Sequence, residues 1–275
     1  MKGVKPRQLW LLLTCLLAAM PAHAAERFII LQSTTSTQNS GLFDFLLPRF
    51  TERTGIEVRV VAVGTGQALK NARNGDGDAL LVHAKEDELA FVEAGFGILR
   101  CDVMYNDFVI VGPKTDPAKV RAAASAAEAL TRIYESRSPF VSRGDDSGTH
   151  KKERQLWRAA GIDPTAASGS WYREVGAGMG ATLNIAAATD AYTLSDRATW
   201  IAFANRRDLD LLFEDDPALF NQYGIILVNP ERHPGVRFRE AKAFRDWLVS
   251  PEGQRAIAAF RVDGQQLFFP NASCE

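Results

Sequence analysis

Strand-length apolar runs alternate with longer amphipathic runs through the first third of the chain, and this alternation limits the fold more than any other feature. The apolar runs cover residues 28–31, 58–63 and 79–84, and the helix-like runs cover residues 41–55, 66–75 and 86–95. A strand followed by a helix, repeated along the chain, is typical of a parallel sheet with helices on both faces. We therefore predict an α/β fold.

Two further apolar strands are predicted at residues 107–113 and 224–230, and they bracket a second set of α/β patterns. This set is expected to open with an Ala-rich helix over residues 118–136. We predict two lobes, each a mostly parallel sheet flanked by helices, joined by two crossing strands. Lobe 1 would comprise residues 25–108 and 226–275, and lobe 2 residues 109–225. One continuous doubly wound sheet is the alternative.

The N-terminus has the order of a secretory signal, with basic residues, a short apolar run and then Ala22-His23-Ala24. We predict a signal peptide over residues 1–24 and a periplasmic mature protein, because the apolar run is too short to span a membrane. Cys15 leaves a lipid anchor as the alternative. In an oxidising compartment the remaining cysteines, Cys101 and Cys274, either form a disulfide or stay free, and the sequence does not decide between the two.

The charge balance argues against a nucleic-acid partner. Removal of residues 1–24 takes three of the 32 basic residues and none of the 33 acidic residues, which leaves a net charge of −4. No overall basic field remains that would gather a polyanion.

Hydroxyl residues and glycines fill the turns after the first two predicted strands. Residues 33–37 read Ser-Thr-Thr-Ser-Thr before a helix start expected near Ser40, and Gly64-Thr65-Gly66 follows the second strand. Unsatisfied N–H groups at a helix start, together with the helix dipole, favour bound anions. Five hydroxyls exceed what one N-cap needs, so we interpret the first turn as an anion site, while a plain cap remains the alternative. For the second turn an ordinary strand-to-helix connection is equally compatible.

The stretch from Ser142 to His150 is the most specific feature of the chain. It places Arg143 before a helix start at Ser147, Gly148 and Thr149. The guanidinium offers five fixed donors and a permanent charge, which suits an oxyanion. Asp145 and Asp146 would repel an anion, so we expect them to cap the helix or to pair with neighbouring cations.

Other motifs are weaker. Residues 176–181 nominally match a dinucleotide fingerprint, with Asp196 at a tolerable distance, but an exported protein rarely keeps a nucleotide; Gly178 is instead a candidate wall of the anion site. Tyr192, Thr193 and Ser195 are assigned to a loop that either touches the ligand or does not. No two histidines or cysteines have metal-ligand spacing, and we interpret His83 as a packed histidine. We predict no cofactor and no metal other than that of a bound metal oxyanion.

Long segments in order, at residues 33–50, 60–84, 103–118, 140–157 and 176–200, resemble the periplasmic tungstate-binding proteins of ABC transporters. The resemblance runs from about Phe28 to the C-terminus and implies a type II periplasmic-binding-protein fold with the oxyanion between the lobes. The Thr-Thr-Thr-Ser hallmark of that family falls on residues 33–36, with Ser33 in place of the first threonine. The selectivity arginine of the family would be Arg143.

The resemblance and the residues together predict a solute-binding protein, not an enzyme, that captures tungstate, or molybdate, as a monomer for a permease in the inner membrane. The predicted ligand residues are Ser33, Thr34, Thr35, Ser36, Thr65, Gly66, Arg143, Ser147, Thr149 and Gly178. A deprotonated tetrahedral dianion needs only donors, whereas protonated phosphate also needs an acceptor. A phosphate or sulfate binder is the nearest alternative, and an exported hydrolase using Ser147 and His150 is the remote one.

Overall fold

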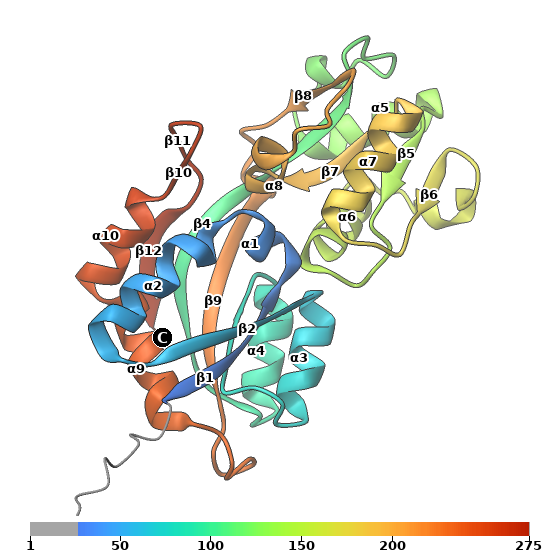
Figure 1. Cartoon of the computed structure of the whole chain (residues 1–275). Helices are drawn as coiled ribbons and strands as arrows, with labels where there is room; N and C mark the ends of the chain where they lie inside the picture. Colours follow the sequence, from blue (N-terminus) through green and yellow to red (C-terminus); the bar gives the residue numbers. More distant parts are fainter. Residues whose placement is uncertain (1–26, 275) are drawn as a thin grey trace, which may run out of the picture.

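The computed structural model describes residues 27–274, so the predicted signal peptide and Cys15 lie outside the described residues. The alternating pattern of the first third forms the predicted parallel strands β1 (Phe28–Thr34), β2 (Glu57–Val63) and β3 (Ala79–Val82). Helices α2 (Leu42–Thr54) and α3 (Thr65–Arg73) connect them, and α4 (Lys85–Glu93) follows β3. We call the part built on this sheet lobe 1 (Figure 1).

Two long strands run between the lobes, as predicted. These are β4 (Gly97–Pro113) and β9 (Phe220–Val228), which pair with each other from Gly97 to Asp107. Beyond that point β4 pairs with β7 (Thr193–Asp196) and β8 (Leu209–Phe213) of the second lobe. In Figure 1 both strands pass from the lower lobe to the upper one. The stated lobe boundaries stay a prediction.

The sheets are mixed, and the expectation of mostly parallel sheets was wrong in this respect. The order in the large sheet is β12-β4-β9-β3-β1-β2, and β9, β4 and β12 (Phe269–Cys274) run antiparallel to their neighbours. Strand β9 returns from lobe 2, so it enters the sheet from the end at which β3 leaves it and runs in the opposite direction. Hydrophobic periodicity carries no information on this direction.

Lobe 2 holds the second set of α/β elements. Its short parallel pair is β5 (Phe140–Ser142) with β6 (Tyr172–Glu174), and its helices are α5 (Ala126–Ser136), α6 (Gly148–Ala159), α7 (Met179–Thr189) and α8 (Arg197–Ala202). Helix α5 begins eight residues later than predicted, because the side chain of Ser125 caps it by accepting the N–H of Glu128. The remaining short elements are η1 (Val120–Ala122), η2 (Pro164–Ala167) and η3 (Pro217–Leu219).

Each lobe has its own hydrophobic core. In lobe 1, Phe43, Phe50 and Phe244 pack with apolar residues of β1 and β9, while in lobe 2 Trp157, Phe140 and Tyr172 pack under α5 and α6. The buried carboxylate of Glu153 fixes α6 to this core by accepting from Trp157 Nε1 at 3.1 Å and Tyr172 Oη at 2.7 Å. The N-terminus of α6 is therefore held on a rigid base. None of the described helices is both long and apolar enough to cross a membrane.

The C-terminal segment packs on lobe 1 through α9 (Phe238–Val249), α10 (Pro251–Ala259), the hairpin β10 (Arg261–Val262) with β11 (Gln265–Gln266), and β12. Strand β12 pairs antiparallel with β4, and Cys274 lies opposite Cys101 in that register. The two cysteines form a disulfide that closes a sequence separation of 173 residues. Of the two alternatives that the sequence leaves open, the structure therefore has the disulfide, which links the C-terminal strand to β4.

Candidate functional site

The hydroxyl run at the end of β1 forms a short helix of its own, α1 (Thr35–Asn39), which was not predicted. Thr34 caps this helix by accepting the N–H of Thr37, and α2 begins after Gly41, which adopts a left-handed conformation. The apolar pattern begins only at Leu42, so the sequence predicts a single helix start near Ser40. Two successive helix starts therefore follow β1.

The predicted hydroxyls of this turn have different partners. Ser33 is fully buried, and its Oγ donates to the carbonyl of Leu81 in β3 at 2.6 Å, so this hydroxyl links two strands. Thr34 Oγ1 lies 2.7 Å from Thr37 Oγ1 and 3.1 Å from Ser36 Oγ. The side chain of Thr35 has no hydrogen bond within the described residues. The turn thus presents Thr34, Thr35 and Ser36, with Ser33 in a structural role.

His83 contacts the same hydroxyls from the end of β3. Its Nε2 lies 3.3 Å from both Thr34 Oγ1 and Ser36 Oγ, and its Nδ1 lies 3.1 Å from Asn221 Oδ1. Burial, followed by the charge of Arg143, lowers the pKa of this ring to about 4, so it is neutral at neutral pH. The interpretation of His83 as a packed histidine describes its burial and misses these polar contacts.

Thr65 opens helix α3 at the end of β2. It is fully buried, and its Oγ1 has no hydrogen-bond partner among the described residues. Gly64 and Gly66 flank it and lie against lobe 2: the N–H of Gly66 donates to the carbonyl of Asp146 at 3.4 Å, and a Cβ on Gly64 would lie 3.5 Å from the carbonyl of Asp145. The glycines thus let the two lobes approach at this hydroxyl.

Arg143 follows β5 in lobe 2 and is 3% exposed. Its Nε and Nη2 donate to Asp145 Oδ2 at 3.1 Å and 2.5 Å, while Asp145 Oδ1 accepts the N–H of Ser147. Asp145 therefore fixes both the arginine and the helix start, as expected. No described residue accepts from Nη1, which remains available to a ligand. Asp146 pairs with Lys151 at 3.0 Å.

Helix α6 begins directly after these acids. The side chain of Ser147 caps it by accepting the N–H of His150, so the hydroxyl of Ser147 already has a structural role. The N–H groups of Gly148 and Thr149, the first two of the helix, have no partner within it. The residue Thr149 is 1% exposed, and its Oγ1 is unpartnered among the described residues.

Gly178, the remaining predicted ligand residue, lies at the start of α7. Gly178 caps this helix, and a Cβ placed on it would have Thr35 Oγ1 as its nearest neighbour, at 3.9 Å. On the other side, a Cβ on Gly148 would lie 2.6 Å from Cε1 of His83. The starts of α1 and α3 from lobe 1 therefore meet the starts of α6 and α7 from lobe 2. The structure brings the predicted residues together at one interlobe contact.

The donor set fits a small anion. Thr65 Oγ1 and Thr149 Oγ1, one from each lobe, are buried hydroxyls without partners, and an unpartnered buried polar group typically costs about 1–3 kcal/mol. A tetrahedral oxyanion between the helix starts would offer acceptors to both. Asp196, at the start of α8, also keeps one unpartnered buried carboxylate oxygen, and burial raises its pKa. It is a further site candidate that sequence reasoning considered only as a nucleotide ligand.

The hydroxyls of Tyr192, Thr193 and Ser195 already have partners within lobe 2. Tyr192 Oη donates to Asp116 Oδ1 at 2.9 Å and accepts the N–H of Ala118. Thr193 and Ser195 are buried in β7, where their hydroxyls donate to backbone carbonyls. The segment is a strand rather than a loop, and these hydroxyls have structural roles.

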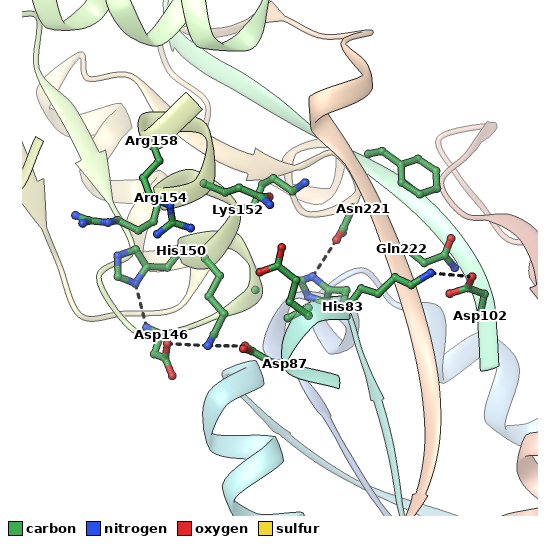
Figure 2. A pocket seen from close by; sticks show the side chains of 17 residues that line it. His83, Asp87, Asp102, Asp146, His150, Lys152, Arg154, Arg158, Asn221 and Gln222 are labelled. Carbon is green, nitrogen blue, oxygen red and sulfur yellow. Dashed lines mark hydrogen bonds and ion pairs between the residues drawn. The ribbon is translucent and has the colours of Figure 1, made fainter. Parts of the chain in front are cut away.

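A cavity of about 640 Å³ lies beside the donor cluster and not within it. It opens between α4, α6 and the start of β9 (Figure 2). His83 and Gly148 line it, but Arg143 and the predicted hydroxyls do not. Four carboxylates share its wall with the cations, so this cavity is a poor anion site. Across it Lys151 of α6 bonds Asp87 of α4 at 2.6 Å, which ties the lobes together.

The arrangement at Ser147 does not resemble a nucleophile with its base. Ser147 Oγ accepts the backbone N–H of His150, while the Nδ1 of the same histidine accepts the N–H of Asp146 at 3.2 Å. Neither ring nitrogen of His150 receives the serine proton. Among the described residues there is also no group of three or more His, Cys, Asp or Glu side chains that could hold a metal ion.

Comparison with known proteins gives consistent matches. The model of the PBP superfamily domain matches residues 19–252. A tungstate-binding protein TupA from Peptoclostridium acidaminophilum is 48% identical over 90% of this chain and 87% of its own length. The solved TupA from Desulfovibrio alaskensis G20 is 47% identical, with a TM-score of 0.77, over 90% of this chain and all of that chain.

A second solved structure, described as the tungstate ABC transporter from Geobacter sulfurreducens, is 49% identical with a TM-score of 0.78 over 86% of this chain and all of that chain. These matches cover 86–90% of this chain and so extend over both lobes. The chain belongs to the PBP superfamily and, within it, to the family of tungstate-binding proteins.

Proposed function

We propose that this protein captures tungstate, and also molybdate, between its lobes in the periplasm and delivers the ion to the permease of an ABC transporter in the inner membrane. It would act as a monomer, without a cofactor and without catalysing a reaction. Thr34, Thr35, Ser36, Thr65, Gly66, Arg143, Thr149 and Gly178 would surround the ion, with Ser33 and Ser147 holding the turns. Family membership and the names of the relatives support this proposal.

One observation carries the choice of ligand class. The buried hydroxyls of Thr65 and Thr149 have no partner among the described residues and belong to facing helix starts, and no described residue accepts from Nη1 of Arg143. Hydrogen bonds to a charged group contribute about 1.5–3 kcal/mol each, so a few of them offset the desolvation of a dianion once water is excluded. Closure of the lobes would then present one shape to the permease.

Phosphate is the second candidate, because Asp196 has a free buried oxygen that could accept a proton from it. Asp145 and Asp146 are already paired with Arg143 and Lys151. Titration calorimetry with tungstate, molybdate, sulfate and phosphate separates the candidates. We expect strong binding of tungstate and molybdate and weak or absent binding of the other two. Binding of phosphate without tungstate would refute the proposal.

Removing an unpartnered hydroxyl should affect stability and binding in opposite directions. Thr65→Val and Thr149→Val are expected to raise the free energy of unfolding of the ligand-free protein by up to about 1 kcal/mol, because each removes an unsatisfied buried group. The same changes should weaken tungstate binding roughly tenfold to a hundredfold, because each removes a donor to a charged ligand. Urea unfolding and calorimetry measure the two effects.

Thr189→Val is the matched control, since this exposed threonine of α7 already bonds the carbonyl of Ile185. It should leave tungstate affinity unchanged. Full affinity in both Thr65→Val and Thr149→Val would place the ion elsewhere.

A further inference from the structure

His83 connects the candidate oxyanion site with both strands that cross between the lobes. Its Nε2 faces Thr34 and Ser36. Its Nδ1 faces Asn221, as Figure 2 shows. Asn221 lies in β9, and its Nδ2 donates at 2.6 Å to Oδ1 of Asn106 in β4. These two asparagines are paired in the register of β4 with β9. A continuous chain of side-chain hydrogen bonds therefore runs from the cap of α1 to the crossing strands.

The donors and acceptors of this chain fix where the proton of His83 lies. Asn221 uses its amide N–H at Asn106, so its carbonyl oxygen faces the histidine and can only accept. Nδ1 must then carry the hydrogen, and Nε2 of the neutral ring is left as an acceptor. One lone pair at Nε2 takes one hydroxyl hydrogen from the Thr34–Ser36 pair. The ring does not need the hydrogen of the other hydroxyl, so a ligand competes for it only with the hydroxyls of the same turn.

The ring is also held by apolar contacts from both lobes. Its centroid lies 4.8 Å from that of Tyr223 in β9, and Gly148 of α6 is so close to it that an added Cβ would lie 2.7 Å from Nδ1. Because Gly148 belongs to lobe 2, closure of the lobes brings α6 against the ring. The orientation of the ring is thus fixed by the closed arrangement itself.

We propose that His83 is a positioning residue for the oxyanion: it accepts a hydrogen from one hydroxyl of the Thr34–Ser36 pair, directs the other hydroxyl to the ion, and links this choice through Asn221 and Asn106 to the crossing strands. This inference rests on the proposed function. Its own readout is the tautomer of His83, which does not require a ligand.

Substitutions that keep the hydrogen bond of only one ring nitrogen test the positioning role of His83. Glutamine places an amide near the position of Nε2 and can still accept from the hydroxyls, whereas asparagine reaches only toward Asn221. We expect His83→Gln to bind tungstate within about threefold of the unchanged protein, and His83→Asn to bind about tenfold more weakly. His83→Phe, which fills the space without hydrogen bonds, should lose at least as much as His83→Asn.

His233→Gln and His233→Asn are the matched controls, because His233 belongs to the loop between β9 and α9 and has none of these contacts. Both should bind like the unchanged protein. Equal affinities in His83→Gln and His83→Asn would overturn the positioning role, because a histidine that only fills space does not distinguish the two amides.

The tautomer can be read in the unchanged protein by long-range ¹H–¹⁵N correlation of labelled histidines. We expect a neutral ring protonated at Nδ1 from pH 5 to pH 8, and a shift of the Nε2 resonance when tungstate is added. A ring protonated at Nε2, or at both nitrogens, would overturn the inference even if the variants do not fold. Failure of the unchanged protein to bind tungstate would refute the proposed function alone and leave the tautomer result standing.

Discussion

Replacing Arg143 by lysine is expected to weaken tungstate binding by roughly tenfold to a hundredfold. Lysine keeps the charge and loses the planar fork, in which Nε and Nη2 bind Asp145 while Nη1 remains for the ligand. A single ammonium group cannot serve both partners from its flexible stem. Arg143→Ala should lower affinity by a factor on the order of 10³, since it removes charged hydrogen bonds and leaves the Asp145 carboxylate uncompensated.

A companion variant separates these two causes. In Arg143→Ala/Asp145→Asn the repelling carboxylate is also absent, so part of the lost affinity should return. Arg121→Lys is the control, because Arg121 pairs with Asp210 on the exposed side of lobe 2. Calorimetry with tungstate measures all four proteins. Unchanged affinity in Arg143→Lys would place this side chain outside the site.

Reduction of the Cys101–Cys274 disulfide is expected to lower the free energy of unfolding by about 5 kcal/mol in the limit where the effect is entirely chain entropy. The cross-link closes a separation of 173 residues, so it removes a large number of conformations from the unfolded chain. Urea unfolding with and without reductant measures this change. Tungstate affinity should stay the same, because neither cysteine belongs to the donor cluster.

The double variant Cys101→Ser/Cys274→Ser provides the control for the reductant. It should unfold at the urea concentration of the reduced protein, and added reductant should have no further effect on it. Identical midpoints for the oxidised and reduced forms of the unchanged protein would contradict the expected contribution.

The parts of the fold that follow from local pattern could be predicted from the sequence. Strands β1 to β3 and the two crossing strands each contain an apolar run, and such runs are visible without knowledge of their neighbours. The short helix α1 could not be predicted, because its five residues contain no apolar periodicity. The antiparallel direction of β9 and β12 depends on where the chain re-enters the sheet, which is a property of the whole topology.

The candidate site divides in the same way. Arg143, Thr65 and Thr149 follow strands and open helices, and this local context was enough to select them. The roles of Ser33 and His83 depend on partners 48 and 138 residues away in the sequence, Leu81 and Asn221. Ser33 bonds Leu81 because the two residues are paired in the register of β1 with β3, and no spacing in the sequence reveals this pairing.

The unequal distribution of charge over the two walls divides capture into two kinetic stages. Lobe 2 carries the guanidinium of Arg143, whereas the wall of lobe 1 consists of neutral hydroxyls and a neutral histidine. We expect an ion that encounters the open protein to be attracted mainly by lobe 2, over a range that salt shortens and with a strength that the paired carboxylate of Asp145 reduces. Lobe 1 has no such reach and acts only at contact, so its hydroxyls and the Lys151–Asp87 pair determine how long the ion resides. The association rate of the ion therefore depends mainly on lobe 2, and its residence time depends on lobe 1 and on the contact between the lobes.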